Sequence, residues 1–367
     1  MSPAHPPLDR GSIGATAADE ATHLHLVPAD GELWENHGWC VRVRGGGSEF
    51  MLWIAFYILR GHPEGRFTVD DVRVAQAVSV HCPSPAAGEQ RMQDNPFAVS
   101  GVNHSEFLPH SELQVELGGT RSAWALAGRL HENEPPVWRV AGPCGPLEVD
   151  LRFDAIAPAS WFRDFELIDG YEVLARVTGT IATPEHGPVE VEGVGQHEKV
   201  HTAVPIQRRD GAGWLTLEEG ERHMWHCGGD QTLAFSMLAN QPGERADLCN
   251  GQVVIAGRQL HFGRDDVEFR EIADWVDPRS GVTIPVGWRI DVRLPEGSLA
   301  LDVAGYARAY YLWDYLKGST SLLYWVMADA TFAWSPAAAG EESQLRRVPY
   351  VAHTNRPFLY WGTPDSR

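Results

Sequence analysis

Alternation of apolar and polar residues with a period of two constrains this chain more than any other feature. Successive side chains of a β-strand point to opposite faces, so such a stretch predicts a strand that is buried on one face only. The apolar members of two clear examples are Leu147, Val149, Leu151 and Phe153 in one stretch, and Trp288, Ile290, Val292 and Leu294 in the other. We find no amphipathic pattern long enough for a substantial helix. The pattern therefore predicts an all-β protein of antiparallel strands.

Turn signals and chain length suggest how the strands are organised. The 37 glycines and 25 prolines favour many turns, and pairs such as Gly118-Gly119 and Gly228-Gly229 separate the alternating runs. A length of 367 residues suits two domains. Polar residues gather at 207–211, where the chain divides into halves of similar strand content. We expect a disordered tail over 1–22, then two tandem β-barrel or sandwich domains over 23–206 and 207–367.

Charge and composition exclude several classes of protein. The formal net charge of -19 argues against binding to nucleic acid or to an anionic membrane, since both need a basic surface. The first twenty residues lack the apolar core of a secretory signal, and no run of 18 apolar residues predicts a membrane span. The five cysteines are scattered without a C-x-x-C pair, which favours reduced thiols and a cytoplasmic location.

No cofactor is indicated by the motifs present. The sequence has neither a P-loop nor a glycine-rich dinucleotide fingerprint. The string His197-Glu198-Lys199-Val200-His201 matches the zinc signature H-E-x-x-H, which works only on a helix. Residues 190–195 alternate as a strand does, and on a strand positions i and i+4 lie about 13 Å apart, too far to share one ion. We therefore predict no metal site here and keep a zinc hydrolase as an alternative.

The strand interpretation of this string yields a different chemical prediction. His197, Lys199 and His201 would point to one face, and Gln196 and Glu198 to the other. We expect His197 or Glu198 to act as general acid or base, with Gln196 contacting the substrate. Moving one proton needs a single positioned group of tuned pKa and no cofactor. Burial would raise the pKa of Glu198 and lower that of His197.

An aromatic cluster near the C-terminus is the second candidate for a functional site. Its rings would suit an apolar, unsaturated ligand, and they could stabilise a developing cation. Asp314 among these rings could donate a proton if its pKa were raised. The residues that we expect to line the pocket are Tyr311, Trp313, Tyr324 and Trp325.

The order of several segments resembles the carotenoid 1,2-hydratase (hydroxyneurosporene synthase) and AttH-like family, with its related natural-product cyclases of Diels–Alderase type. The segments that carry the resemblance are 34–59, 179–181, 191–198, 284–290, Trp214 to Leu217, and Tyr324-Trp325. The resemblance implies lipocalin-like domains and places Trp214 at the substrate. At two motifs the chain departs from the family, with Gln196-His197-Glu198 replacing Asp-His and Val326-Met327 replacing Glu-Gly.

Three functions are compatible with these features. The first, which we favour, is a cofactor-free hydratase, isomerase or cyclase acting on a hydrophobic terpenoid, polyene or polyketide. The second is a non-catalytic carrier of a lipophilic metabolite, because the same barrel and rings would serve it without an acid or base. The third is the zinc hydrolase that would use His197, Glu198 and His201.

Overall fold

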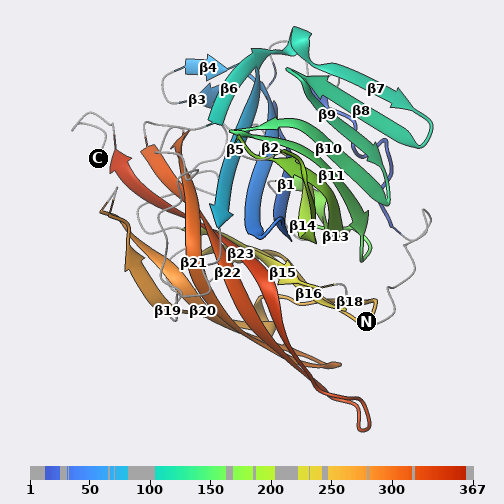
Figure 1. Cartoon of the computed structure of the whole chain (residues 1–367), viewed down its shortest axis with the longest axis vertical. Helices are drawn as coiled ribbons and strands as arrows, with labels where there is room; N and C mark the ends of the chain where they lie inside the picture. The colour runs from blue at the N-terminus through green and yellow to red at the C-terminus, as the bar shows by residue number, and fades with distance from the viewer. Residues whose placement is uncertain are drawn as a thin grey trace.

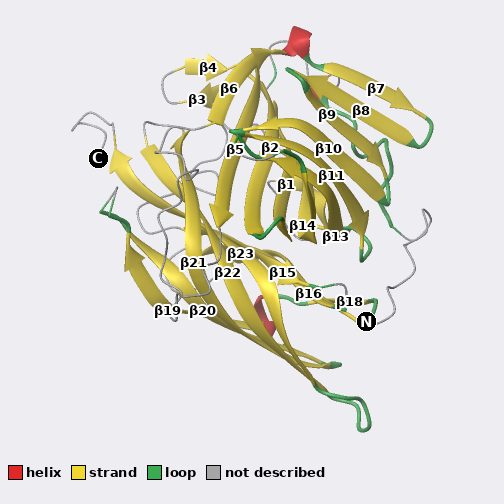
Figure 2. Ribbon diagram, viewed as in Figure 1, coloured by secondary structure: helices red, strands yellow, loops and turns green. Residues whose placement is uncertain are grey.

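The computed structural model describes residues 13–24, 31, 33–64, 67–69, 71–81, 104–162, 168–184, 187–202, 222–230, 232–241, 247–278, 281–315 and 319–360. Nearly all regular structure in these ranges is antiparallel strand, with two single-turn 3-10 helices, η2 (His110–Glu112) and η4 (Arg264–Asp266) (Figure 2). The predicted all-β class is confirmed.

The strands form two large curled sheets, one from each half of the chain (Figure 1). The N-terminal sheet contains β1 (Leu33–Gly45), β2 (Ser48–Arg60), β5 (Asp71–His81), β6 (His104–Pro109), β7 (Gln114–Gly118), β8 (Arg121–Leu126), β9 (Arg129–Glu134), β10 (Val137–Cys144), β11 (Leu147–Ala155), β12 (Ser160–Trp161), β13 (Ile168–Ala182) and β14 (Val189–Thr202). The C-terminal sheet contains β15 (Arg222–Gly229), β16 (Leu233–Gln241), β17 (Asp247–Ile255), β18 (Arg258–His261), β19 (Val267–Val276), β20 (Thr283–Leu294), β21 (Gly297–Tyr315), β22 (Ser319–Pro336) and β23 (Gln344–Tyr360). A small hairpin pairs β3 (His62–Glu64) with β4 (Phe67–Val69).

The two sheets share one topology. In each sheet the first strand pairs with the last, β1 with β14 and β15 with β23. From the first strand the order runs outward through β2, β5 and β6, and in the second sheet through β16, β17 and β18. The remaining strands run outward on the other side of the last strand, so each half is an up-and-down meander that curls into a half-barrel. This repeat agrees with two tandem lipocalin-like domains.

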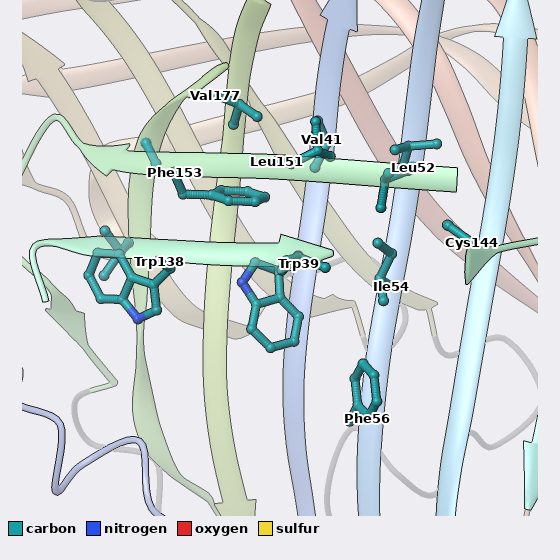
Figure 3. Packing of buried hydrophobic residues seen from close by; sticks show 14 of the residues in the cluster. Trp39, Val41, Leu52, Ile54, Phe56, Trp138, Cys144, Leu151, Phe153 and Val177 are labelled. Carbon is teal, nitrogen blue, oxygen red and sulfur yellow. The ribbon is translucent and has the colours of Figure 1, made fainter. Parts of the chain in front are cut away.

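The core has three main parts. One fills the N-terminal half-barrel, where Trp39, Trp138 and Phe153 lie among aliphatic side chains (Figure 3). A second fills the C-terminal half-barrel. The third lies between the two sheets and includes Trp53, Trp225 and Trp325. This third cluster, which we call the domain junction, buries side chains from both halves.

The limits of the two sheets bear on the expected domain organisation. The N-terminal sheet ends at Thr202 and the C-terminal sheet begins at Arg222, and the boundary expected after residue 206 lies outside the described residues. Residues 13–22, which we placed in the tail, are packed against the N-terminal domain, with Ile13 and Glu20 fully buried. In the described part of the chain, no helix has the length and apolar character needed to cross a membrane.

At Gly193 the strand β14 approaches β1 so closely that there is no room for a side chain. A Cβ at this position would lie 2.1 Å from the Arg42 carbonyl oxygen on β1, so the backbone would have to move. We expect Gly193→Ala to lower the free energy of unfolding by about 1–3 kcal/mol in a chemical denaturation experiment. Gly118→Ala is the matched control, because it adds the same methyl group where nothing lies within 4 Å. Equal stability of the two variants would contradict the packing described here.

Candidate active site at the domain junction

Two glutamates lie opposite each other on the junction face of the N-terminal sheet. Glu172 of β13 and Glu198 of β14 are direct partners in the strand register, so their side chains leave the sheet side by side. Glu172 is fully buried. Glu198 lies deep in the molecule but keeps part of its surface open. Two carboxyl groups placed this closely cannot both ionise without mutual repulsion.

Glu172 accepts hydrogen bonds from three strands of the opposite domain. Trp225 Nε1 donates to Oε1 over 3.1 Å, Ser236 Oγ to Oε2 over 3.1 Å, and Asn250 Nδ2 to Oε2 over 2.7 Å. Burial raises the pKa of Glu172 to about 7, although these hydrogen bonds oppose the shift. Glu172 is therefore a polar link between the two domains.

Glu198 has fewer partners and the more strongly shifted pKa. Burial and the neighbouring charge of Glu172 raise its pKa to about 8, against a hydrogen bond that Asn36 Nδ2 donates to Oε1. Most Glu198 side chains are therefore protonated at neutral pH. Because Gly38 is the register partner of Glu198 on β1, no side chain covers the carboxyl from that position. Glu198 thus combines a transferable proton with an open surface.

Aromatic side chains flank these carboxyl groups. Trp225, which donates to Glu172, meets Trp325 edge-on with ring centroids 5.5 Å apart. Trp325 stacks on Trp53 at 5.2 Å and on His353 at 4.3 Å. Its Nε1 is buried and has no hydrogen-bond partner in the described part of the chain. The junction therefore contains a group of packed indole rings that contacts Glu172 through Trp225.

Comparison with known proteins was made on sequence and on structure. Neither protein-family models nor curated protein sequences match the chain. Among solved structures, a protein assigned as an AttH from Nitrosomonas europaea matches with a TM-score of 0.55 and 12% identity, covering 96% of this chain and 100% of the other. CghA matches with a TM-score of 0.52 and 11% identity over 90% of both chains. Kievitone hydratase from Nectria haematococca gives 0.50 and 10%, covering 97% of this chain and 98% of its own.

This chain has the AttH-like fold. The resemblance that the sequence motifs suggested is thus confirmed at the level of architecture. Within this fold the two faces of β14 separate as the alternation predicted. Gln196 and Glu198 face the junction, where the amide oxygen of Gln196 accepts from Ser236 Oγ over 3.4 Å. His197 faces the interior of the N-terminal half-barrel, with its Nε2 3.0 Å from Glu20.

The zinc alternative finds no geometric support. His197 and His201 lie on the strand β14 and not on a helix, and they have different neighbours. His201 stacks on His23 at 4.0 Å, whereas His197 contacts Glu20. Among the described residues, no group of three or more His, Cys, Asp and Glu side chains is arranged to hold a metal.

The aromatic residues that we expected to line one pocket do not all face the same part of the protein. Trp325 faces the junction. Tyr324 faces the opposite way, where its hydroxyl donates to Asp277 Oδ2 over 3.2 Å beside the buried Arg308–Asp277 ion pair. The backbone of Tyr311, Trp313 and Asp314 lies in β21, but their side chains are outside the described residues, as is the whole of Trp214.

Sequence reasoning missed Glu172, its three donors and Asn36. The single local signal for Glu172 is a charged residue between the apolar Tyr171 and Val173. That signal does not reveal which residue stands opposite. Only the pairing of β13 with β14 brings Glu172 to Glu198.

Proposed function

We propose that the domain junction is the active site of a cofactor-free enzyme acting on an apolar, unsaturated small molecule, with Glu198 as general acid. The observation that carries this proposal is the pair Glu172 and Glu198, two adjacent carboxyl groups of raised pKa, of which Glu198 is mostly protonated at neutral pH. A carboxylic acid kept neutral by burial is a suitable proton donor to a carbon–carbon double bond. Terpenoid, polyene and polyketide compounds are the substrate classes that this chemistry suits.

The proposed reaction needs no cofactor, because Glu198 both supplies the proton and accepts one back. The O–H bond of Glu198 breaks as a C–H bond forms on the alkene, leaving a carbocation and a carboxylate. The indole faces of Trp53 and Trp325 stabilise the cation. Water then adds to the cation and returns a proton to Glu198, which completes a hydration; the reverse sequence is a dehydration. Loss of a different proton from the cation to the Glu198 carboxylate gives an isomer. Attack by a second double bond closes a ring and moves the positive charge, and the new cation then loses a proton to the Glu198 carboxylate.

The similarity to kievitone hydratase supports this chemistry at the level of fold only, since 10% identity does not carry residue roles. Glu198 is the stronger candidate for the acid because part of its surface is open, whereas Glu172 is enclosed by three donors. We assign Glu172 to raising the pKa of Glu198 and to joining the domains. Gln196 and Trp325 are the described side chains that we expect to contact the substrate.

Solvent incorporation tests the proposal. The wild-type protein is incubated in D₂O and in H₂¹⁸O with a panel of terpenoids, polyenes and polyketide enones, and the products are analysed by mass spectrometry. We expect label to enter at least one compound. Glu198→Gln should reduce that rate about 10²–10⁴-fold, because the amide keeps the shape and cannot donate the proton.

Glu192→Gln is the control, since it makes the same change on the exposed part of β14 and should keep the wild-type rate. Full activity of Glu198→Gln would refute the role of Glu198. Tight binding of a compound by the wild type with no turnover would favour a carrier instead.

A further inference from the structure

A second polar cluster lies on the other face of the same strands, inside the N-terminal half-barrel. Its centre is Glu20, whose side chain is fully buried. Glu20 does not belong to the sheet: it comes from residues 13–24, a segment without strand structure that precedes β1. This N-terminal segment inserts one carboxylate into a chamber that the strands have built.

The strands bind this carboxylate with several hydrogen-bond donors. Trp138 Nε1 of β10 donates to Oε1 over 2.5 Å, and the Tyr171 hydroxyl of β13 donates to the same oxygen. His197 Nε2 of β14 lies 3.0 Å from Oε1 and 3.2 Å from Oε2, and His37 Nδ1 of β1 lies 3.7 Å from Oε2. The donors on β10, β13 and β14, together with the more distant His37 ring on β1, form a cradle for one carboxylate.

The cradle favours the ionised form of Glu20. Burial raises the pKa of Glu20, but attraction to His197, contact with that ring's nitrogen and attraction to His37 outweigh it and hold the pKa well below its usual value. His197 Nδ1 faces the Gly38 carbonyl oxygen at 3.0 Å, so both nitrogens of this ring face acceptors.

The interior of the N-terminal half-barrel also contains polar atoms that make no hydrogen bond to Glu20. Trp39 stacks on His197 with ring centroids 4.7 Å apart, and His131 lies 4.0 Å from Trp39. Trp124 lies 4.0 Å from His37. Among the residues that the structure describes, the indole nitrogens of Trp39 and Trp124 and both ring nitrogens of His131 have no hydrogen-bond partner, although all three residues are at most 2% exposed. Buried polar atoms of this kind commonly mark a site where water or a ligand completes the bonding.

We propose that the interior of the N-terminal half-barrel is a binding site for small carboxylates, and that the chain fills it with its own Glu20. The N-terminal segment thus acts as an intramolecular ligand. Among the described contacts, its backbone oxygens accept hydrogen bonds, Ile13 O from Ala159 N over 2.7 Å, Gly14 O from Trp161 Nε1 over 3.1 Å and Leu24 O from Arg60 Nη1 over 3.1 Å. Further bonds to Glu35 come from Thr22 Oγ1 over 3.0 Å and from the backbone of His23 over 2.9 Å.

Chemical rescue tests this proposal on the full-length chain. Glu20→Ala removes Cγ and the carboxylate, and acetate supplies the same two carbons and two oxygens. We expect sodium acetate at about 0.2 M to raise the Tm of Glu20→Ala by several degrees above its value in sodium chloride of equal ionic strength. Acetamide, a neutral molecule of similar shape, should give no such increase. The wild type should respond equally to acetate and chloride because Glu20 already fills the site.

A second substitution tests whether the increase in Tm depends on the donors of the cradle. Glu20→Ala/Tyr171→Phe lacks one of the donors, so acetate should bind it about tenfold more weakly, as judged from the concentration dependence of Tm. If Glu20→Ala is recovered only unfolded, its refolding yield in acetate and in chloride is compared instead, and a higher yield in acetate supports the site.

Equal Tm values, or equal yields, in acetate and chloride would overturn the proposal, and so would an undiminished response of the double variant. None of these measurements uses the junction or a substrate. Their outcome is therefore independent of the proposed catalytic role of Glu198.

Discussion

Glu198→Gln is expected to be more stable than the wild type at pH 8, by on the order of 4 kcal/mol, and equally stable near pH 4. The pKa of Glu198 is raised to about 8 in the folded protein, from 4.5 in the absence of the fold. Below pH 4.5 both states hold the proton. Between pH 4.5 and 8 only the folded state holds it, so each pH unit costs the folded wild type about 1.4 kcal/mol.

A glutamine at position 198 cannot ionise, and its amide oxygen can still accept from Asn36. The difference in free energy of unfolding between variant and wild type should therefore grow from pH 4.5 to 8 and then level off. Urea denaturation across this range measures it. Taking the difference cancels the titration of other buried groups, such as His23 and His201, whose pKa values burial lowers to about 4.

Glu192→Gln is again the control, because it removes a carboxyl from an exposed position of the same strand. Its stability should follow the wild-type curve at every pH. If the curves of Glu198→Gln and the wild type are parallel instead, Glu198 is ionised in the folded protein at neutral pH. The proposed general acid would then lack its proton.

Glu172→Ala is expected to destabilise the protein by about 3–5 kcal/mol at pH 6. The substitution removes the acceptor of Trp225 Nε1 and Asn250 Nδ2, leaves Ser236 Oγ with only the longer contact to Gln196, and opens a cavity in the junction. Because all three donors belong to the C-terminal sheet, the loss should also weaken the attachment of one domain to the other. Urea denaturation followed by tryptophan fluorescence measures the change.

Glu172→Gln separates the contribution of the hydrogen bonds to stability from the contribution of the side-chain volume, because glutamine fills nearly the same space. Its oxygen can replace Oε2 and accept from Ser236 and Asn250, but its amide group would meet the Trp225 indole as a second donor. We expect a loss of about 1–3 kcal/mol, smaller than that of the alanine variant. If the two variants were equally stable, Glu172 would not link the domains through these bonds.

The candidate site shows which structural features local sequence patterns can predict. Alternation along 190–201 correctly placed Glu198 and His197 on opposite faces, since a strand has no other way to arrange them. The same rule separates Tyr324 from Trp325, two neighbours on β22 that we had expected to line one pocket. Consecutive residues of a regular strand cannot both face one site, so this division was already present in the sequence.

The partners of these residues were not predictable from the sequence. Glu172 is 26 positions from Glu198 along the chain, and Glu20 is 177 from His197. Hydrophobic periodicity contains no information about which strand lies beside which, or about an irregular segment that enters a barrel from outside the sheet. The polar tail pattern of residues 1–22 gave no indication that Glu20 would be buried.

The sequence by itself determined that this chain forms antiparallel strands with one buried face, because the alternation of side chains is a local property of extended backbone. It also determined which side chains share a face. The tertiary structure alone decided that two glutamates meet at the domain junction and that a carboxylate from the N-terminal segment fills the half-barrel. Both arrangements depend on strand register and on packing between distant segments. Burial raises the pKa values of Glu172 and Glu198, whereas attraction to His197 and His37 lowers the pKa of Glu20 against the effect of burial.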